Sequence, residues 1–396
     1  MIRRRQAPLT ITLALLVAVL AAGLAWWWTR PLPPAPAAPI ASLKVVDFGD
    51  LPGWADDDHA KALAAFRVSC TRLVRLGADR KLGRAGLAGQ AKGWHEACQA
   101  AETASDARDF FESQFRPVAV IPTTGKGLFT GYYEPLLRGS RTADATYRVP
   151  LHKRPDDMIT ADLGKFRDEL KGKRVTGRVK GGELVPYYSR AEIGDGALDG
   201  RGLELVWVDD PVDAFFLQIQ GSGVVALPDG TTMRVGYAAQ NGHPYFAIGR
   251  ELIRRNAVPR ERMSMQAIRA WLAANPDEGD KVMRMNPSYV FFRENTAAGA
   301  IGAQGVVLTP DRSLAVDRRI YPMGVPIWLD TKLPDDQPLR RLMLAQDTGG
   351  AIRGPVRGDV FFGAGDAAGA LAGRMKQAGD WYLLLPKTVD PPALLY

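Results

Sequence analysis

The residues best suited to chemistry in this sequence are two aspartates near its C-terminus. Asp347 follows an apolar run and opens a glycine-rich turn, whereas Asp359 is followed directly by Val360, Phe361 and Phe362. Apolar neighbours disfavour the charged form of a carboxyl group and so raise its pKa. A carboxyl that stays protonated near neutral pH can act as a general acid toward a glycosidic oxygen. The competing interpretation is that both aspartates only cap turns, as Asp beside Gly often does.

Other catalytic chemistries find little support in the sequence. No two histidines stand at the i, i+4 spacing of a metal-binding helix, and the two cysteines show no metal-ligand spacing. The Gly-x-Ser-x-Gly pattern of a serine nucleophile is also missing. We therefore expect carboxylate chemistry with no metal and no other cofactor.

Three aspartates are spaced along the C-terminal part of the chain, Asp317, Asp347 and Asp359, and Tyr321–Pro326 follows the first of them. This arrangement resembles the C-terminal three-aspartate (3D) domain of the membrane-bound lytic murein transglycosylase A family. Three upstream segments also resemble motifs of the family: Phe129–Pro135, Gln218–Gly223 and Gly236–Gly242. The resemblance covers roughly residues 115–390.

The resemblance implies a mainly β fold with a helical N-terminal layer (α+β). A double-psi β-barrel would be assembled from two chain segments, with a second β-barrel domain inserted between them and a groove between the two domains. The family cleaves the β-1,4 bond from N-acetylmuramic acid to N-acetylglucosamine in peptidoglycan and leaves a 1,6-anhydro end. Asp359 would be the single catalytic acid/base, and the C6 hydroxyl of the sugar would be the nucleophile, already held within the substrate.

The same resemblance suggests roles for other motif residues. Asp347 would orient the substrate, or cap a turn, and Asp317 is expected to be structural. Two glutamines at alternating positions of a strand would share one face and could hydrogen-bond to the glycan. The expected substrate-binding residues, which could instead belong to a strand core or a solvated face, are Thr130, Tyr132, Tyr133, Gln218, Gln220 and Ser222.

Two alternatives to a transglycosylase remain open. A hydrolase would need a second carboxylate beside Asp359, for which Asp347, Glu134 or Asp366 are candidates. A non-catalytic, expansin-like glycan-binding module would need none of these groups for chemistry.

Helical periodicity precedes the motifs. It predicts one helix over residues 57–80, which carries Cys70, and another over residues 94–115, which carries Cys98. In an oxidising compartment an even pair of cysteines suggests one disulfide. We therefore expect a Cys70–Cys98 bond between the two helices.

From Val118 onward, short apolar runs separated by Gly, Pro and Asp predict the strands of a barrel. A helical stretch is expected over residues 245–285. The predicted strands are Leu128–Tyr133, Leu203–Val208, Ala214–Ile219, Val306–Leu308, Pro326–Leu329 and Arg341–Ala345. With the resemblance, the predicted domains are the barrel domain with its helices, residues 45–137 and 288–396, and the inserted substrate-binding domain, residues 138–287.

The N-terminus predicts attachment to a membrane. Residues 1–8, with Arg3, Arg4 and Arg5, would form a cytoplasmic tip, and residues 9–28 an apolar anchor of about 20 residues. A Pro/Ala linker, residues 29–44, would follow. This places the enzyme on the periplasmic side of the inner membrane; the alternative is a cleaved signal peptide and a periplasmic protein. No cysteine follows the run directly, so we expect no lipid modification, unlike in the best-known family members.

The composition limits the expected partners. Among 396 residues the formal net charge is +8, which suits an anionic cell-wall polymer or a membrane surface. Basic residues are spread along the chain without a tract of stacking aromatics, so no nucleic-acid partner is expected. The expected partners are the glycan strands of peptidoglycan and the membrane, and the sequence identifies no protein partner in wall synthesis or division.

Overall fold

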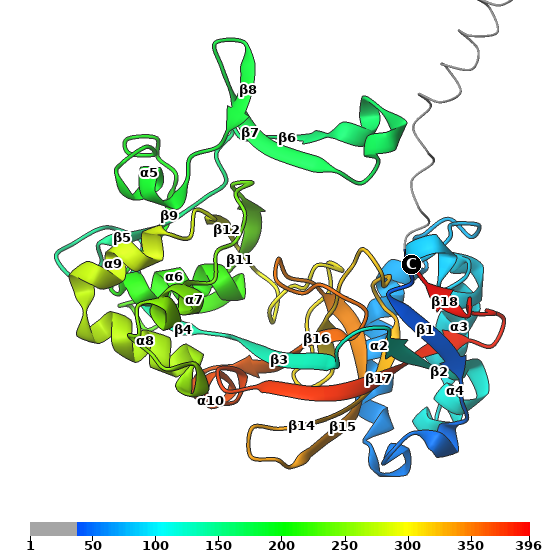
Figure 1. The fold of residues 1–396 in the computed structure, drawn as a ribbon. Helices are drawn as coiled ribbons and strands as arrows, with labels where there is room; N and C mark the ends of the chain where they lie inside the picture. Colours follow the sequence, from blue (N-terminus) through cyan, green and yellow to red (C-terminus); the bar gives the residue numbers. More distant parts are fainter. Residues whose placement is uncertain (1–37) are drawn as a thin grey trace, which may run out of the picture. The chain divides into compact units, whose positions relative to one another are not determined.

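A computed structural model describes residues 38–396 of the chain (Figure 1). The predicted cytoplasmic tip, the apolar segment and most of the Pro/Ala linker lie outside the described residues. Within the described range, no helix combines the length and the apolar character needed to cross a membrane.

Three helices form the N-terminal layer: α2 (His59–Leu73), α3 (Ala91–Thr103) and α4 (Ala107–Gln114). The single helix predicted over residues 94–115 is therefore two helices. The break follows from Asp106, whose side chain accepts a hydrogen bond from the Asp109 backbone N–H and starts a new helix. Cys70 of α2 and Cys98 of α3 form a disulfide, with 5.5 Å between their Cα atoms.

The largest sheet has nine strands in the order β14-β15-β13-β16-β3-β17-β2-β1-β18. Because β14 also pairs with β17, six of these strands, β14, β15, β13, β16, β3 and β17, form a closed ring. The strands of this sheet are β1 (Ala41–Val45), β2 (Phe115–Pro122), β3 (Gly127–Glu134), β13 (Ser313–Ala315), β14 (Pro326–Lys332), β15 (Pro338–Asp347), β16 (Arg357–Ala364), β17 (Lys376–Pro386) and β18 (Leu394–Leu395).

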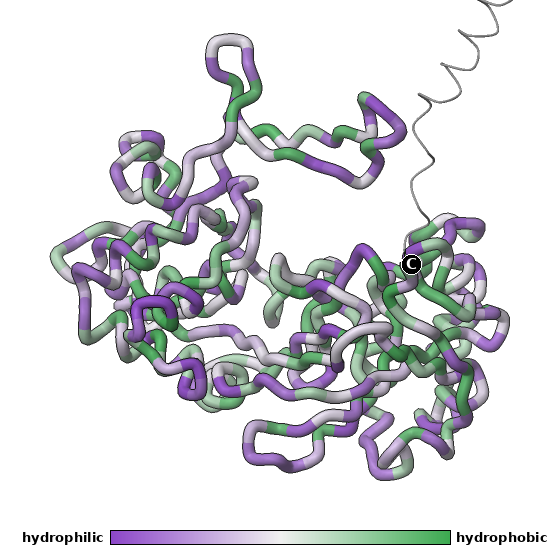
Figure 2. Tube along the Cα trace, viewed as in Figure 1, coloured by the Kyte–Doolittle hydropathy of each residue, from purple (hydrophilic) through white to green (hydrophobic). Residues whose placement is uncertain are grey.

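The largest hydrophobic core joins this sheet to the helices. Hydrophobic residues are frequent along α2, α3, α4 and the neighbouring strands (Figure 2). Trp94 of α3, Trp328 of β14 and Trp381 of β17 are almost completely buried in this core. Burial of such large side chains holds the N-terminal layer against the ring of strands.

The chain between β3 and β13 forms a second, separate sheet with the order β12-β11-β10-β4-β9-β5, and a small third sheet with the order β6-β7-β8. The second sheet has its own hydrophobic core. Its strands are β4 (Leu136–Ser140), β5 (Val149–His152), β9 (Glu204–Val208), β10 (Ser222–Ala226), β11 (Thr232–Gln240) and β12 (Val290–Glu294), and those of the third sheet are β6 (Ile159–Asp162), β7 (Arg174–Lys180) and β8 (Glu183–Pro186). The fold is thus mixed α/β, with two main sheets that form separate domains.

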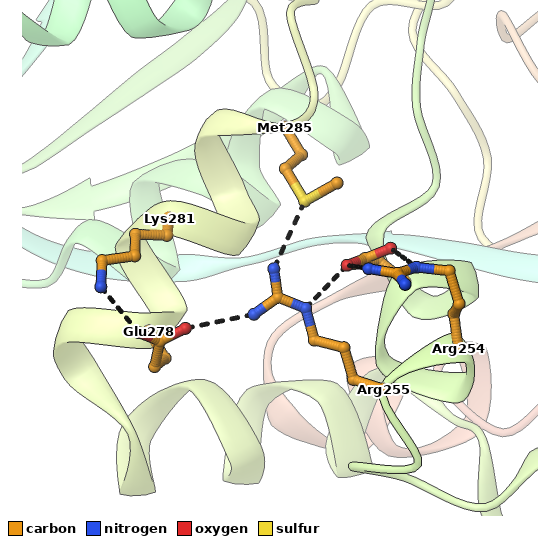
Figure 3. Close-up of polar contacts among 6 residues, drawn as sticks. Arg254, Arg255, Glu278, Lys281 and Met285 are labelled. Carbon is orange, nitrogen blue, oxygen red and sulfur yellow. Dashed lines mark hydrogen bonds and ion pairs between the residues drawn. The ribbon is translucent and has the colours of Figure 1, made fainter.

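Helices accompany the second sheet. The helical stretch predicted over residues 245–285 contains α7 (Ile248–Arg254), α8 (Met265–Ala274) and α9 (Pro276–Arg284). Arg255, directly after α7, donates hydrogen bonds to Glu251 of α7 and to Glu278 of α9 and so links the two helices (Figure 3). The remaining α-helices among the described residues are α5 (Arg190–Gly194), α6 (Pro211–Gln220) and α10 (Asp366–Ala372).

Two predicted strands are wrong. Residues 214–219 lie in α6, which begins after the capping carboxylate of Asp210, has Pro211 in its first turn and ends at Gly221 with φ of 84°. Residues 306–308 form no strand, and only an isolated bridge joins Val307 to Ile301. On a helix, residues two apart point roughly 200° away from each other. The expectation that Gln218 and Gln220 share a face is therefore also wrong.

Candidate active site

The pairing of β3 with β16 positions the first pair of site residues. These strands run parallel, and Thr130 of β3 stands opposite Asp359 of β16. The Thr130 hydroxyl donates a short hydrogen bond to Oδ1 of Asp359 and accepts one of 2.9 Å from Nη2 of Arg357. Within residues 38–396, Oδ2 of Asp359 has no hydrogen-bond partner. This oxygen is therefore free to exchange a proton with a ligand.

The surroundings of Asp359 keep its carboxyl protonated in mildly acidic conditions. Burial raises the pKa of Asp359 to about 6, because the charged form loses hydration. The positive charge of Arg357 and the hydrogen bond from Thr130 oppose this rise, and the negative charge of Asp347 adds to it. A pKa near 6 suits a general acid that works in mildly acidic or neutral conditions.

Asp347 ends β15 and is held by three donors. The hydroxyl of Tyr132 donates to Oδ2 over 2.9 Å, and the backbone N–H groups of Ala303 and Thr348 donate to Oδ1 over 2.9 and 2.8 Å. Burial raises the pKa of Asp347, while these hydrogen bonds lower it. Asp347 thus fixes the Tyr132 hydroxyl and the loop around Ala303, and it has less freedom than Asp359 to exchange a proton.

One short strand brings the aspartates together. Ala315 of β13 pairs with Asp347 on one side and with Asp359 on the other. Asp317 follows two residues later, fully buried, and binds the guanidinium of Arg319 and the backbone N–H of Gly354. Burial alone would raise the pKa of Asp317, but these hydrogen bonds outweigh it and hold the pKa below its usual value. Asp317 is thus an ionised anchor for the glycine-rich turn.

The predicted substrate-binding residues separate into two groups. Tyr132 lies beside Asp347, and its ring centroid is 5.2 Å from that of Phe361. Tyr133 is instead buried against α10, and its backbone N–H donates to Oε1 of Gln220 over 3.1 Å. Gln220 therefore connects α6 to β3.

Gln218 and Ser222 belong to the second domain. Gln218 is buried and accepts a hydrogen bond of 2.6 Å from Arg190, whose guanidinium lies over the ring of Phe215. Ser222 begins β10, is partly exposed, and pairs through its backbone with Gly236. The structure thus brings two hydrogen-bonded pairs, Asp359 with Thr130 and Asp347 with Tyr132, to the two sides of Ala315. Gln218 belongs to a separate group of contacts with Arg190.

Arg357 is a site residue that the sequence reasoning missed. It stands two positions before Asp359, so the alternation of a strand places both side chains on one face. This spacing is the signal that could have revealed it. Among the described residues, no three His, Cys, Asp or Glu side chains are grouped so as to hold a metal ion.

Comparison with known proteins relates this chain to a family. Residues 128–293 match the MltA-specific insert domain, and residues 312–385 match the 3D domain. Membrane-bound lytic murein transglycosylase A of Vibrio cholerae is 36% identical over 264 residues, which are 64% of this chain and 64% of the relative. The matched region thus spans a little less than two thirds of this relative.

Solved structures match over more of the chain. The crystal structure of a membrane-bound lytic murein transglycosylase from Agrobacterium tumefaciens is 38% identical, with a TM-score of 0.79, and the match covers 87% of this chain and 98% of that one. A structure of Escherichia coli MltA with bound chitohexaose is 28% identical, with a TM-score of 0.65, and the match covers 88% and 95% of the two chains.

The fold and the site define a protein that combines a 3D domain with an MltA-type insert. The chain belongs to the MltA family of membrane-bound lytic murein transglycosylases, and the resemblance expected from the sequence motifs is confirmed.

Proposed function

We propose that this protein is a lytic transglycosylase that cleaves the β-1,4 bond between N-acetylmuramic acid and N-acetylglucosamine in peptidoglycan and leaves 1,6-anhydro ends. The observation that carries the proposal is the carboxyl of Asp359. It is held on one oxygen by Thr130, is free on the other, and has a pKa of about 6. Family membership and the chitohexaose bound by the E. coli relative support a β-1,4-linked amino-sugar substrate.

The proposed chemistry uses one carboxyl twice. Protonated Asp359 gives its proton to the glycosidic oxygen as the bond from that oxygen to C1 breaks. The Thr130 hydroxyl and the charge of Arg357 stabilise the carboxylate that remains. This carboxylate then takes the proton of the C6 hydroxyl as its oxygen attacks C1. The nucleophile belongs to the substrate, so no water is consumed and the aspartic acid is regenerated.

The proposal includes the architecture expected for the family. The closed ring of strands would be a double-psi β-barrel, with a barrel domain close to residues 45–137 and 288–396, apart from β12 and the start of β4, which pair in the second sheet. Residues 138–287 would be an inserted β-rich domain that binds substrate across a groove. In this groove Tyr132 and Thr130 would meet the glycan directly, and Tyr133, Gln218, Gln220 and Ser222 would bind it or hold its binding surfaces. Residues 9–28 would anchor the enzyme to the inner membrane with the catalytic domain in the periplasm.

The geometry disfavours two of the three candidates for the second carboxylate of a hydrolase, Glu134 and Asp347. Glu134, one candidate for the second carboxylate, is buried and binds Arg234 over 2.5 Å. Asp347 already accepts three hydrogen bonds. Neither group is as free as Asp359 to activate a water molecule.

Mass analysis of fragments released from purified peptidoglycan tests the proposal. We expect the wild-type protein to release anhydro-muropeptides, which are one water lighter than hydrolysis products, and Asp359→Asn to lose at least about 10³-fold in kcat, since amide replacement removes the only acid and base. Asp335→Asn, in an exposed turn, serves as the control and should retain full activity. Products with reducing ends would establish a hydrolase, and binding without any release would establish a glycan-binding module.

A further inference from the structure

A cavity of about 400 Å³ lies where helices of the second domain meet strand β3 and the end of α10. Its volume falls within the range of about 300–1,000 Å³ that is typical of small-molecule sites. The lining is mainly apolar and includes Ile219 of α6, Met263, and Ile268 of α8. Methionine and isoleucine side chains accept small apolar groups but offer a sugar ring few hydrogen bonds.

Two cations line the same cavity, and no acidic residue does. These are Arg250 of α7 and Lys376 at the start of β17. Within the described part of the chain neither side chain forms an ion pair, whereas Arg254 and Arg255, close to Arg250 in sequence, both bind Glu251. The cavity therefore combines an apolar interior with two uncompensated positive charges. That combination fits a ligand with small apolar groups and carboxylates.

Strand pairing relates Lys376 to the proposed catalytic carboxyl. Thr130 of β3 stands opposite Asp359 of β16 on one side and opposite Lys376 of β17 on the other. Residues directly opposite in neighbouring strands project from the same face of the sheet. Two strand spacings amount to about 10 Å, so Lys376 emerges that far from Asp359 on the same face.

We propose that this cavity is a subsite for the peptide carried by the glycan, with Arg250 and Lys376 binding its carboxylates and the apolar lining receiving its methyl groups. The inference rests on the proposed function, because peptidoglycan is the glycan that bears short peptides of alanine and diacid residues. The peptide is attached to the sugar whose bond is cleaved. It must therefore leave the cleavage site close to where Lys376 emerges.

Binding measurements test this subsite separately from catalysis. The full-length Asp359→Asn protein is mixed with intact peptidoglycan and with glycan strands stripped of peptide by an amidase, and the bound fraction gives a Kd for each polymer. Adding Arg250→Gln or Lys376→Gln should raise the Kd for the intact polymer at least about fivefold more than the Kd for the stripped polymer. Lys376→Arg should restore the preference, because the cation remains.

Matched controls remove a positive charge elsewhere. Arg254→Gln and Lys281→Gln each remove a cation that is paired with a glutamate (Figure 3). Neither residue lines the cavity, so both variants should leave the ratio of the two Kd values unchanged. Thermal unfolding checks that every variant is folded. The subsite is overturned if Arg250→Gln and Lys376→Gln leave the ratio of the Kd for intact polymer to the Kd for stripped polymer unchanged. It is also overturned if the controls change this ratio as much as these two variants do. The proposed function fails through a different result, the absence of anhydro products from the wild-type enzyme.

Discussion

At the scale of single residues, the proposed catalysis depends on a balance of charges around one carboxyl. Burial and the negative charge of Asp347 favour the protonated form of Asp359, whereas Arg357 and Thr130 favour the ionised form. A proton donor that must become a base in the same reaction needs both influences. A carboxyl in water would be ionised too early, and one without Arg357 and Thr130 would hold its proton too strongly.

The pH dependence of the reaction follows from this balance. Because Asp359 has a pKa of about 6 and must start protonated, kcat/KM should be highest below pH 6 and fall about tenfold per pH unit above it. Arg357→Met removes a charge that lowers this pKa, so the falling limb of the profile should move to higher pH. The measurement is kcat/KM against pH with soluble glycan strands.

The control for this prediction is Arg374→Met, which replaces an exposed arginine whose side chain donates to the carbonyl of Ala370. Its profile should coincide with that of the wild type. A limb that stays in place or moves to lower pH in Arg357→Met would show that another group controls the rate.

At the scale of elements, the sequence predicted four strands correctly and two wrongly. The apolar runs around Phe129, Trp328 and Leu344 lie in strands β3, β14 and β15, as expected. The run that ends at Gln220 lies in α6 instead. An apolar segment of six residues suits a buried strand or a buried helix equally, and the deciding signals are Asp210 and Pro211 before it and Gly221 after it.

The disulfide between α2 and α3 gives a prediction at this scale. It closes a loop with a sequence separation of 28, so the entropy it removes from the unfolded chain should stabilise the protein by about 3–4 kcal/mol. We expect the Cys70→Ser, Cys98→Ser protein to have a free energy of unfolding lower by this amount and therefore to unfold at a lower urea concentration. The wild-type protein in a reducing agent should behave like the double variant. Equal midpoints for the oxidised and reduced protein would contradict the prediction.

At the scale of the whole described chain, the polypeptide leaves the ring of strands after β3, forms the second domain, and returns to the ring at β13. An ion pair connects the two domains. Glu134, at the end of β3, is 2% exposed and binds Arg234 of β11. The backbone carbonyl of Glu134 also accepts a hydrogen bond from Gly365, directly before α10. This residue thus links a barrel strand, the second sheet and the helix beside the proposed site.

Removing one partner of this ion pair should lower the free energy of unfolding. Arg234→Met would leave a buried carboxylate without its cation, and such changes typically cost about 3–5 kcal/mol of folding free energy. We expect a lower midpoint of thermal unfolding, partly restored by adding Glu134→Gln, which removes the buried charge. Arg138→Met is the matched control, because Arg138 is exposed and forms an ion pair with Asp209. Equal destabilisation by both arginine variants would show that the Arg234–Glu134 pair contributes no more to stability than the exposed Arg138–Asp209 pair.

The sequence by itself determined the family, the two N-terminal helical regions with their cysteines, and the aspartates of the 3D motif. These signals are local, since a motif, a helical period or an apolar neighbour is read within a few residues. Only the tertiary structure decided which groups surround Asp359. Thr130 is 229 positions away along the chain and reaches Asp359 only because β3 and β16 pair in parallel register. The antiparallel pairing of β17 with β3 places Lys376 on that face. Contacts between such distant strands depend on the closure of the whole ring, which no short segment encodes.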